Sequence, residues 1–267
     1  SSWLNNPIAR DYVAKQALRK NHIDVPTTFD ITECMPLVNA YYRENMPRIE
    51  GLFMAERKIN PALDAWFEER FVSDMSNESL RQYPRGSVGN LLYRYVTLNG
   101  FKADFTEGQP LGQTHFEYFN KRLSQQHDLE HLLGGFALHY LGEIGVTYMR
   151  VGAYFKYLSP ELAGMLNTTY TFLLGPLMMR TCLHYPETFN TWYDVVHQGM
   201  TVGRQSEPMF MMKYEPVLHL PVEEAREQLG FRGVVEMDVK READIWGENV
   251  PVAIDPRLVE DVAEAAE

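Results

Sequence analysis

The chain has 267 residues, of which 45% are hydrophobic and 23% are charged, and its formal net charge at pH 7 is -11. This composition excludes a disordered, collagen-like or disulfide-framework protein, and the length allows a substantial core. We expect a single domain over residues 1–267. The acidic balance and the lack of a run of Lys and Arg argue against a nucleic-acid partner.

Cysteine usage and the absence of targeting patterns bear on the compartment. Cys34 and Cys182 are far apart and lie in no metal-binding spacing, which favours a reducing compartment. The first residues lack a basic region before an apolar stretch, so neither a signal nor a transit peptide is predicted. The best candidate span, residues 170–179, is short and interrupted by Gly175-Pro176. We expect a cytoplasmic protein that can contact a membrane but does not cross it.

The first third of the chain shows the apolar spacing of amphipathic helices. Pro36 and Pro47 are predicted to mark helix boundaries, because proline removes a backbone donor and clashes with the preceding turn. Asn60 followed by Pro61 predicts a capped helix start. Ser87 is expected to cap the next helix, after a link rich in turn residues. This part is therefore predicted to consist of helices separated by proline.

The middle of the chain is predicted to be helical and is its most apolar part. Residues 99–115 have the composition of a loop, and helical periodicity then resumes over 116–131 and again over 141–157. Ser159 is expected to cap the helix that follows. Breaks at Gly175-Pro176 and Pro186 would divide the remaining Met- and aromatic-rich stretch into two helices.

The last part of the chain gives weaker signals. Residues 209–220 and 231–239 contain β-branched residues and allow a small β-hairpin, whereas 222–229 predicts a helix closed by Gly230. The acidic, alanine-rich tail over 258–267 allows a terminal helix or a frayed end. The predicted fold class is mainly α, a single-domain helical bundle-like fold with at most a small hairpin near the C-terminus.

One group of side chains has a specific chemical pattern. On a helix, His127, His131 and Asp128 would project at about 0°, 40° and 100°, so three ligand-capable groups share one face. Two neutral imidazoles and a carboxylate suit a divalent ion such as Zn, Fe, Mn or Co, and Glu143 would supply a fourth ligand. The sequence predicts a metal site at these four residues, which would act in catalysis through the metal, and no nucleotide cofactor.

Glu143 can reach this site only if the chain turns back. Twelve residues of straight helix would place its Cα about 18 Å beyond His131, much further than a metal bond spans. Gly134-Gly135 lies between the two residues and is the place in this stretch where a helix is most easily ended and reversed. We therefore predict a helix break at this glycine pair.

These residues also allow ordinary structural interpretations. A His pair four residues apart also occurs on ordinary helix surfaces, and only the adjacent Asp, the glycine break and the later Glu raise it above that background. Glu130 could serve as a base beyond the metal ligands, but a solvated charge is the favoured interpretation. The remaining histidines are interpreted as structural or exposed: His22, His115, His139, His184, His197 and His219.

A set of Met and aromatic residues could line a pocket for a flexible lipid. Thioethers and rings adapt to irregular apolar ligands, although core packing is the better explanation for any single member. The set comprises Tyr148, Met149, Phe155, Tyr157, Met165, Phe172, Met178 and Met179.

The motif resembles a known family signature. The segment from His127 to Gly134, followed by Leu141-Gly142-Glu143, resembles His-Asp-x-x-His-x(11)-Glu of the coenzyme Q (ubiquinone) biosynthesis family counted fourth in the Coq series (Coq-four family). Residues 84–89 resemble that family's Pro-x-Gly-Ser-x-Gly link, and residues 224–230 resemble its C-terminal helix end. The resemblance covers residues 80–230, and residues 231–267 form an extension that departs from the family.

The resemblance implies a mostly α-helical fold and peripheral contact with the inner face of an energy-transducing membrane. It also implies binding of a prenylated aromatic lipid, work alongside other quinone-biosynthesis enzymes, and removal of the ring carboxylate of the quinone precursor with replacement by a hydroxyl. This would be a metal-dependent lyase or oxygenase-type decarboxylase. A homodimer is possible, although no sequence feature points to one.

The sequence is also compatible with two other functions. The first is a prenyl-lipid-binding scaffold of the quinone biosynthesis complex whose metal is structural. The second is an HD-type phosphohydrolase, which is also helical and has a His-Asp doublet but needs an additional upstream His and a distant Asp. His115 is the nearest upstream candidate, and its spacing from His127 is short for this role.

Overall fold

The computed structural model describes residues 5–18, 20, 35–104, 106, 108, 110–247 and 255–257. These residues form α-helices joined by short links and contain no β-strand, so the mainly α prediction is confirmed. The helices are α2 (Pro7–Leu18), α3 (Met35–Ile59), α4 (Pro61–Glu69), α5 (Asn77–Leu80), α6 (Val88–Asn99), α7 (His115–Gly134), α8 (Tyr140–Tyr157), α9 (Pro160–His184), α10 (Phe189–Gln205), α11 (Val222–Leu229) and α12 (Lys240–Gly247). Three 3-10 turns, η1 (Pro186–Thr188), η2 (Met209–Met211) and η3 (Glu215–Val217), link the later helices.

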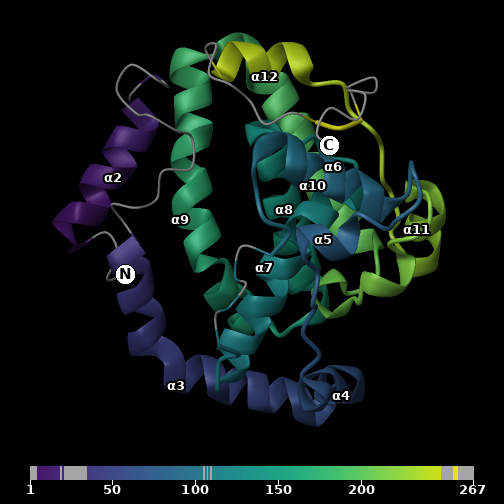
Figure 1. Cartoon of the computed structure of the whole chain (residues 1–267). Coiled ribbons are helices and arrows are strands. Elements are labelled where there is room, and N and C mark those ends of the chain that lie inside the picture. Colours follow the sequence, from purple (N-terminus) through teal and green to yellow (C-terminus); the bar gives the residue numbers. More distant parts are fainter. Residues whose placement is uncertain are drawn as a thin grey trace.

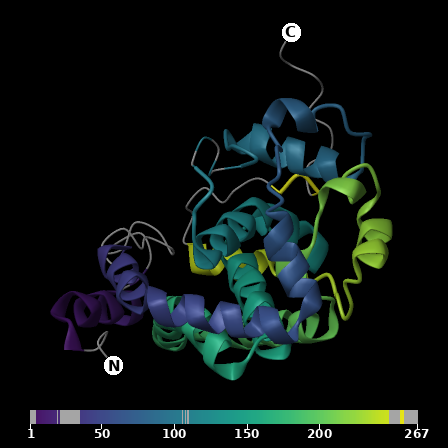
Figure 2. The same ribbon diagram turned by 90° about the horizontal axis from the view of Figure 1, so that it is seen from below.

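Helices α7, α8 and α10 occupy the middle of the molecule (Figure 1). The two views agree that α2 and α9 lie on one side and α11 on the other, with α3 passing along the lower edge of Figure 1 (Figure 2). Among the described helices, none combines the length and apolarity needed to cross a membrane. The predicted tail over residues 258–267 lies outside the described part of the chain.

Several predicted helix starts are confirmed. The Asn60 side chain accepts a hydrogen bond from Leu63 N–H at 3.1 Å, and Ser87 accepts one from Asn90 N–H at 3.3 Å. These bonds satisfy amides that have no partner inside the helix. Helix α9 begins after Ser159 as predicted, but the Ser159 side chain makes no capping hydrogen bond.

The predicted breaks at Pro47 and Pro176 are wrong, because α3 and α9 each run straight through their proline. An internal proline costs a helix about 3 kcal/mol. Tertiary packing offsets this cost, since Ile49 follows Pro47 and is fully buried, and Leu177 follows Pro176 and is 1% exposed. The predicted break at Pro186 is correct, because α9 ends at His184.

The hairpin allowed near the C-terminus is also absent from the described residues. Residues 209–217 contain the 3-10 turns η2 and η3, and residues 231–239 have no regular structure. The nearest approach to sheet pairing in the described chain is one isolated bridge between Ser87 and Pro221. Prolines at positions 208, 216 and 221 remove backbone donors that a ladder would need, which explains the failure of the β-branched signal.

Helix α8 lies against α10 at a separation set by glycine. A Cβ on Gly203 would lie 2.0 Å from the carbonyl oxygen of Met149, and one on Gly199 would lie 2.4 Å from that of Gly145. Only glycine lets the two backbones approach this closely. Since α8 carries Glu143, this contact fixes the helix from which a predicted ligand projects.

Three apolar cores support the described helices. The largest one joins α3, α4, α6, α7, α8 and α9, and contains Phe119 and Leu132 of α7. The smallest one joins α2 and α3 through Ala9, Tyr12 and Val38. The third one lies where α8, α9, α10 and α12 meet, and consists of Leu141, Ile144, Leu174, Leu177, Tyr185, Trp192, Val195, Val239, Ala243 and Trp246. Trp246 is fully buried, and losing such a side chain costs about 3–5 kcal/mol. The end of α12 is therefore firmly packed against the start of α8.

Candidate metal centre

Helix α7 brings two of the predicted ligands together. It begins with a capping box between Thr114 and Glu117 and ends at Gly134. His127 and His131 lie one turn apart on it, with ring centroids 5.0 Å apart and ring planes at 89°. The predicted sharing of one helical face by the two imidazoles is thus present in the structure.

The chain reverses at the predicted glycine pair. Gly135 ends α7 in the left-handed conformation with φ of 79°, and residues 135–139 form a turn, hereafter the α7–α8 turn, before α8 begins. A Cβ at Gly135 would be strained by this φ and would also lie 2.7 Å from Val234 Cγ1. The predicted break near Gly134-Gly135 is confirmed.

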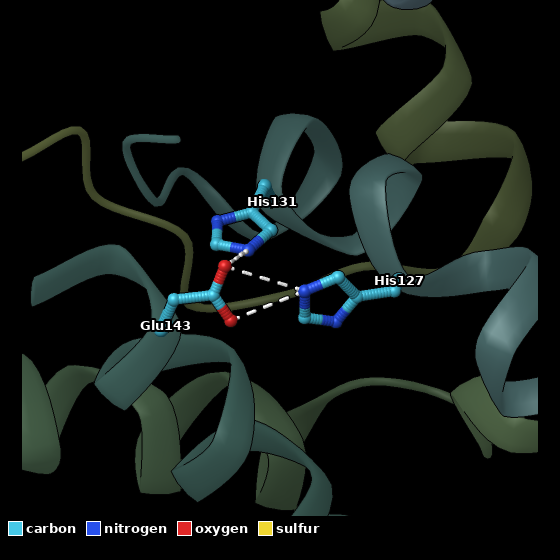
Figure 3. A group of neighbouring side chains, drawn as sticks. All are labelled: His127, His131 and Glu143. Atoms are coloured by element: carbon cyan, nitrogen blue, oxygen red, sulfur yellow. Dashed lines mark hydrogen bonds and ion pairs between the residues drawn. The ribbon is translucent and has the colours of Figure 1, made fainter. Parts of the chain in front are cut away.

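The reversal brings Glu143 to both histidines (Figure 3). Its carboxylate oxygens lie 3.1 Å from His127 Nε2 and 3.2 Å from His131 Nε2. One ligand atom from each of the three residues falls within 4.8 Å of the others. His131 is fully buried, whereas the side chains of His127 and Glu143 are 26% and 31% exposed. The group is therefore buried on one side and open on the other.

The three groups influence one another's ionisation. Burial opposes ionisation of Glu143, but the two adjacent imidazoles outweigh it and hold the pKa of Glu143 well below its usual value. Burial likewise disfavours an imidazolium at His127, but Glu143 outweighs it and raises the pKa of His127. Without a metal, Glu143 therefore favours the protonated form of His127. A cation bound at the cluster would compete with that proton.

A backbone carbonyl orients His131. Its Nδ1–H donates to the carbonyl oxygen of Ala137, in the α7–α8 turn, at 2.9 Å. This bond fixes the tautomer and leaves Nε2 available to face Glu143. The carbonyl itself needs Gly142, because a Cβ at that position would lie 1.6 Å from the Ala137 oxygen. Sequence reasoning missed both features, although the Leu-Gly-Glu triplet contained a signal for the second.

Asp128 lies beside the group but outside it. The cluster of converging ligand atoms contains His127, His131 and Glu143 only, among the residues that the structure describes. Burial raises the pKa of Asp128, and the charges of His127 and His131 oppose that rise. The Tyr95 side chain on α6 is buried near Asp128 and Glu143, and burial followed by these carboxylates raises its pKa. The role of Asp128 as a fourth ligand stays a prediction.

Glu130 is not the solvated charge that the sequence favoured. Its side chain is fully buried and pairs with Arg150 of α8, whose Nε lies 2.6 Å from Glu130 Oε2. Arg150 also donates to the Leu123 carbonyl at 2.7 Å. This cross-link joins the two helices that carry the ligands. The Glu130–Arg150 pair was missed because no local sequence pattern shows that the Arg150 side chain points into the core.

The other side chains considered from the sequence do not join the group. His115 lies at the start of α7, where Nδ1 contacts Glu50 at 2.7 Å and Nε2 contacts Arg57 at 2.8 Å. It therefore does not supply the upstream ligand of an HD-type phosphohydrolase. The Met and aromatic set is divided, with Met149 in the core and Phe155, 51% exposed, at the surface. It does not form one pocket wall.

The comparisons with known proteins show the family and the fold of the chain. The family model described as coenzyme Q (ubiquinone) biosynthesis protein Coq4 matches residues 70–234, compared with 80–230 from the sequence. No curated protein sequence matches the chain significantly. A crystal structure of a protein from Nostoc punctiforme PCC 73102, provisionally named a ubiquinone biosynthesis protein, is similar with a TM-score of 0.58 and 20% identity. The similarity covers 84% of this chain and 94% of that one, and shows a shared fold.

The family match spans more than half of the 267 residues and contains His127, Asp128, His131 and Glu143. It ends at residue 234, directly before most of the C-terminal extension. The chain therefore belongs to the Coq4 family of coenzyme Q (ubiquinone) biosynthesis proteins.

Proposed function

We propose that the protein is a metal-dependent enzyme of ubiquinone biosynthesis. Its reaction would be the oxidative decarboxylation (C1 decarboxylation and hydroxylation) of a prenylated 4-hydroxybenzoate-type intermediate. The bond from the ring to the carboxylate carbon would break with release of CO2, and O2 as co-substrate would supply the hydroxyl oxygen, its second oxygen atom leaving as water with two electrons and two protons from a reductant. The observation that carries this proposal is the convergence of two imidazole nitrogens and a carboxylate at a site with one open side. A site of this kind leaves room for substrate beside the metal, which a closed structural site does not.

The donor set fits a divalent metal. Ligand atoms each about 2.1 Å from one ion at a tetrahedral angle lie about 3.4 Å apart, and the carboxylate oxygens lie 3.1 and 3.2 Å from the two Nε2 atoms. The donors suit Zn, Fe, Mn or Co, and Asp128 is our candidate for a fourth ligand. Such an ion would supply positive charge beside the substrate carboxylate or phenolate.

The chain's own groups would prepare this chemistry. The Ala137 carbonyl keeps a proton on Nδ1 of His131, so that Nε2 faces the site with its lone pair. Glu143 is held ionised by the two histidines, so that the carboxylate needs no deprotonation before it binds a cation. The Glu130–Arg150 pair holds α7 and α8 in register.

An apolar cavity supports the prenyl part of the proposal. It has a volume of about 150 Å³ and is lined chiefly by aromatic and aliphatic side chains, including Phe116 and Leu123 of α7 and Tyr154 and Tyr170. Leu123 lies one helical turn before His127, on the same side of α7. Since pockets for whole drug-sized ligands measure about 300–1,000 Å³, this cavity would hold only part of a prenyl chain.

The same proposal places the protein at the cytoplasmic face of the inner membrane, in peripheral contact with lipid and with other quinone-biosynthesis enzymes. The alternative is a prenyl-lipid-binding scaffold in which the metal is structural. The partly open site favours the enzyme, because a structural metal is usually enclosed by four protein ligands.

The test combines metal analysis with an activity assay. Protein purified without added metal is analysed for metal content and for conversion of a prenylated 4-hydroxybenzoate, alongside Glu143→Gln, His131→Ala and the control His197→Ala, an exposed residue of α10. We expect stoichiometric metal and conversion in the native chain and the control, and loss of both in the other variants. No metal in the native chain would refute the site. Conversion that persists in folded His131→Ala would refute the enzymatic role of the metal and leave the scaffold.

A further inference from the structure

The C-terminal extension packs against the α7–α8 turn, which brings the predicted metal ligands of α7 and α8 together. Val234 packs over Gly135, and its Cγ1 would lie 2.7 Å from a Cβ placed there. Helix α12 follows and lies across the top of the molecule in Figure 1, over the ends of the central helices. Its residues Ala243 and Trp246 share a core with Leu141 and Ile144, which flank Glu143 in sequence. The extension thus contacts both sides of the α7–α8 turn.

A chain of ion pairs links the extension to the end of α7. Arg226 of α11 donates to the carbonyl oxygens of Leu133 at 2.9 Å and Leu132 at 3.0 Å, two groups that have no partner within α7. The same guanidinium pairs with Glu236. Glu236 in turn lies 3.6 Å from Nη1 of Arg257. We call Arg226, Glu236 and Arg257 the C-terminal clamp.

Arg257 is the last member of this series of ion pairs and contacts the α7–α8 turn itself. Its Nη2 donates to the carbonyl oxygen of Phe136 at 3.2 Å, and Asp255 holds the guanidinium in place at 2.6 Å. The next carbonyl along the backbone, that of Ala137, accepts the hydrogen bond from His131. Arg257 therefore binds the Phe136 carbonyl, which is next along the backbone to the Ala137 carbonyl that orients His131.

We propose that the C-terminal clamp is a positioning device for the metal centre. Arg226 fixes the last turn of α7, Arg257 fixes the carbonyl before Ala137, and Glu236 couples the two arginines. The clamp touches neither the metal nor substrate, and acts by limiting where the Ala137 carbonyl can lie. The inference rests on the proposed function, because it assigns to residues outside the ligand set a role in the affinity of that set.

The clamp is chemically suited to this role. A guanidinium presents several donors in a fixed plane, so that Arg257 can bind a carbonyl and two carboxylates at once. Lysine offers one charged nitrogen and cannot reproduce that geometry. Partners that orient a metal-bound His typically change metal affinity by about 10–100-fold when they are removed. The clamp acts one peptide group further away, so we expect the lower end of that range.

The test uses the full chain with Arg257→Gln, Arg257→Lys and the matched control Arg241→Gln. Arg241 also lies in the extension, but its side chain is 80% exposed and, among the residues that the structure describes, pairs with the neighbouring Glu242 alone. Cobalt(II) binding is titrated by its visible absorption. We expect about tenfold weaker binding and an altered spectrum in Arg257→Gln, partial recovery in Arg257→Lys, and native values in Arg241→Gln.

A second measurement needs no metal. Amide hydrogen exchange of metal-free protein is compared over residues 132–143, and we expect faster exchange there in Arg257→Gln, with native rates in α10. Unchanged exchange, or native cobalt affinity despite faster exchange, would overturn the clamp. If the native chain binds no cobalt, the proposed metal centre fails, while the exchange data still decide whether Arg257 holds the turn.

Discussion

Replacing Gly142 by alanine is expected to weaken metal binding by disturbing a carbonyl group. The new Cβ would lie 1.6 Å from the oxygen and 2.7 Å from the carbon of the Ala137 carbonyl. Carbon and oxygen atoms in close contact are separated by about 3.3 Å, so the carbonyl or the start of α8 must move by well over 1 Å. The 2.9 Å hydrogen bond from His131 Nδ1 cannot survive such a displacement.

Two effects of Gly142→Ala can be separated by magnitude. Overpacking should destabilise the fold by about 1–3 kcal/mol, which for a chain of this size lowers Tm by about 2–12 °C. Loss of the partner of a metal-binding imidazole should weaken metal affinity by about 10–100-fold. The affinity is measured at a temperature where the variant is folded, so the second effect is not a consequence of the first.

The matched control is Gly164→Ala in α9, because a Cβ at Gly164 would meet no atom within 4 Å. Alanine is favoured over glycine in a helix by about 1 kcal/mol, so this variant should be at least as stable as the native chain and bind metal equally well. Thermal unfolding and cobalt titration check both variants. Native metal affinity in folded Gly142→Ala would refute the role assigned to the Ala137 carbonyl.

Three further predictions concern the surroundings of the site. Arg150→Leu leaves Glu130 buried without its partner and should lower the free energy of unfolding, measured in urea, by about 3–5 kcal/mol. Adding Glu130→Leu should recover most of this loss. A double variant as unstable as Arg150→Leu would contradict the pairing. Burial lowers the pKa of His139 to about 4 from its ordinary 6.5. Between these values the unfolded chain binds a proton that the folded chain does not, so stability should fall as the pH falls from 6.5 to 4. The slope is at most about 1.4 kcal/mol per pH unit, and an unchanged pH profile in His139→Gln would count against it. Asn60→Ala removes a helix cap and should cost about 1 kcal/mol without altering metal content, which thermal unfolding and metal analysis together check.

The sequence predicts well what depends on local geometry. The two imidazoles on one face follow from helical periodicity, and the reversal at Gly135 follows from the backbone freedom of glycine. The prediction failed at Pro47 and Pro176, where local chemistry argued for an end to the helix but burial of the following residues outweighed it. Local signals set preferences of a few kcal/mol, which tertiary packing can exceed.

Contacts between distant segments could not be predicted. Glu130 has the sequence context of a surface charge, and its burial depends on Arg150, twenty residues later on another helix. The partner of His131 is a backbone carbonyl, a group that every residue carries and that no sequence pattern marks. Arg257 is still further away and lies outside the family match, so nothing in the motif points to it.

The spacing of the signature itself has a structural explanation. The eleven residues between His131 and Glu143 comprise three that complete α7, the five of the α7–α8 turn, and three that begin α8. Each helical residue added or removed rotates its helix face by about 100°, which would turn Glu143 away from the histidines. The number is therefore fixed by helical phase on both sides of a turn of defined length.

The same geometry requires glycine at two positions. The turn requires a left-handed residue at Gly135, and the return of the Ala137 carbonyl to His131 leaves no room for a side chain at Gly142. Two histidines, an aspartate and a glutamate at the signature spacing could arise by chance on one long helix, where Glu143 would be far from the others. Glycine at both positions distinguishes a chain that folds back to form a site from one that only repeats the spacing.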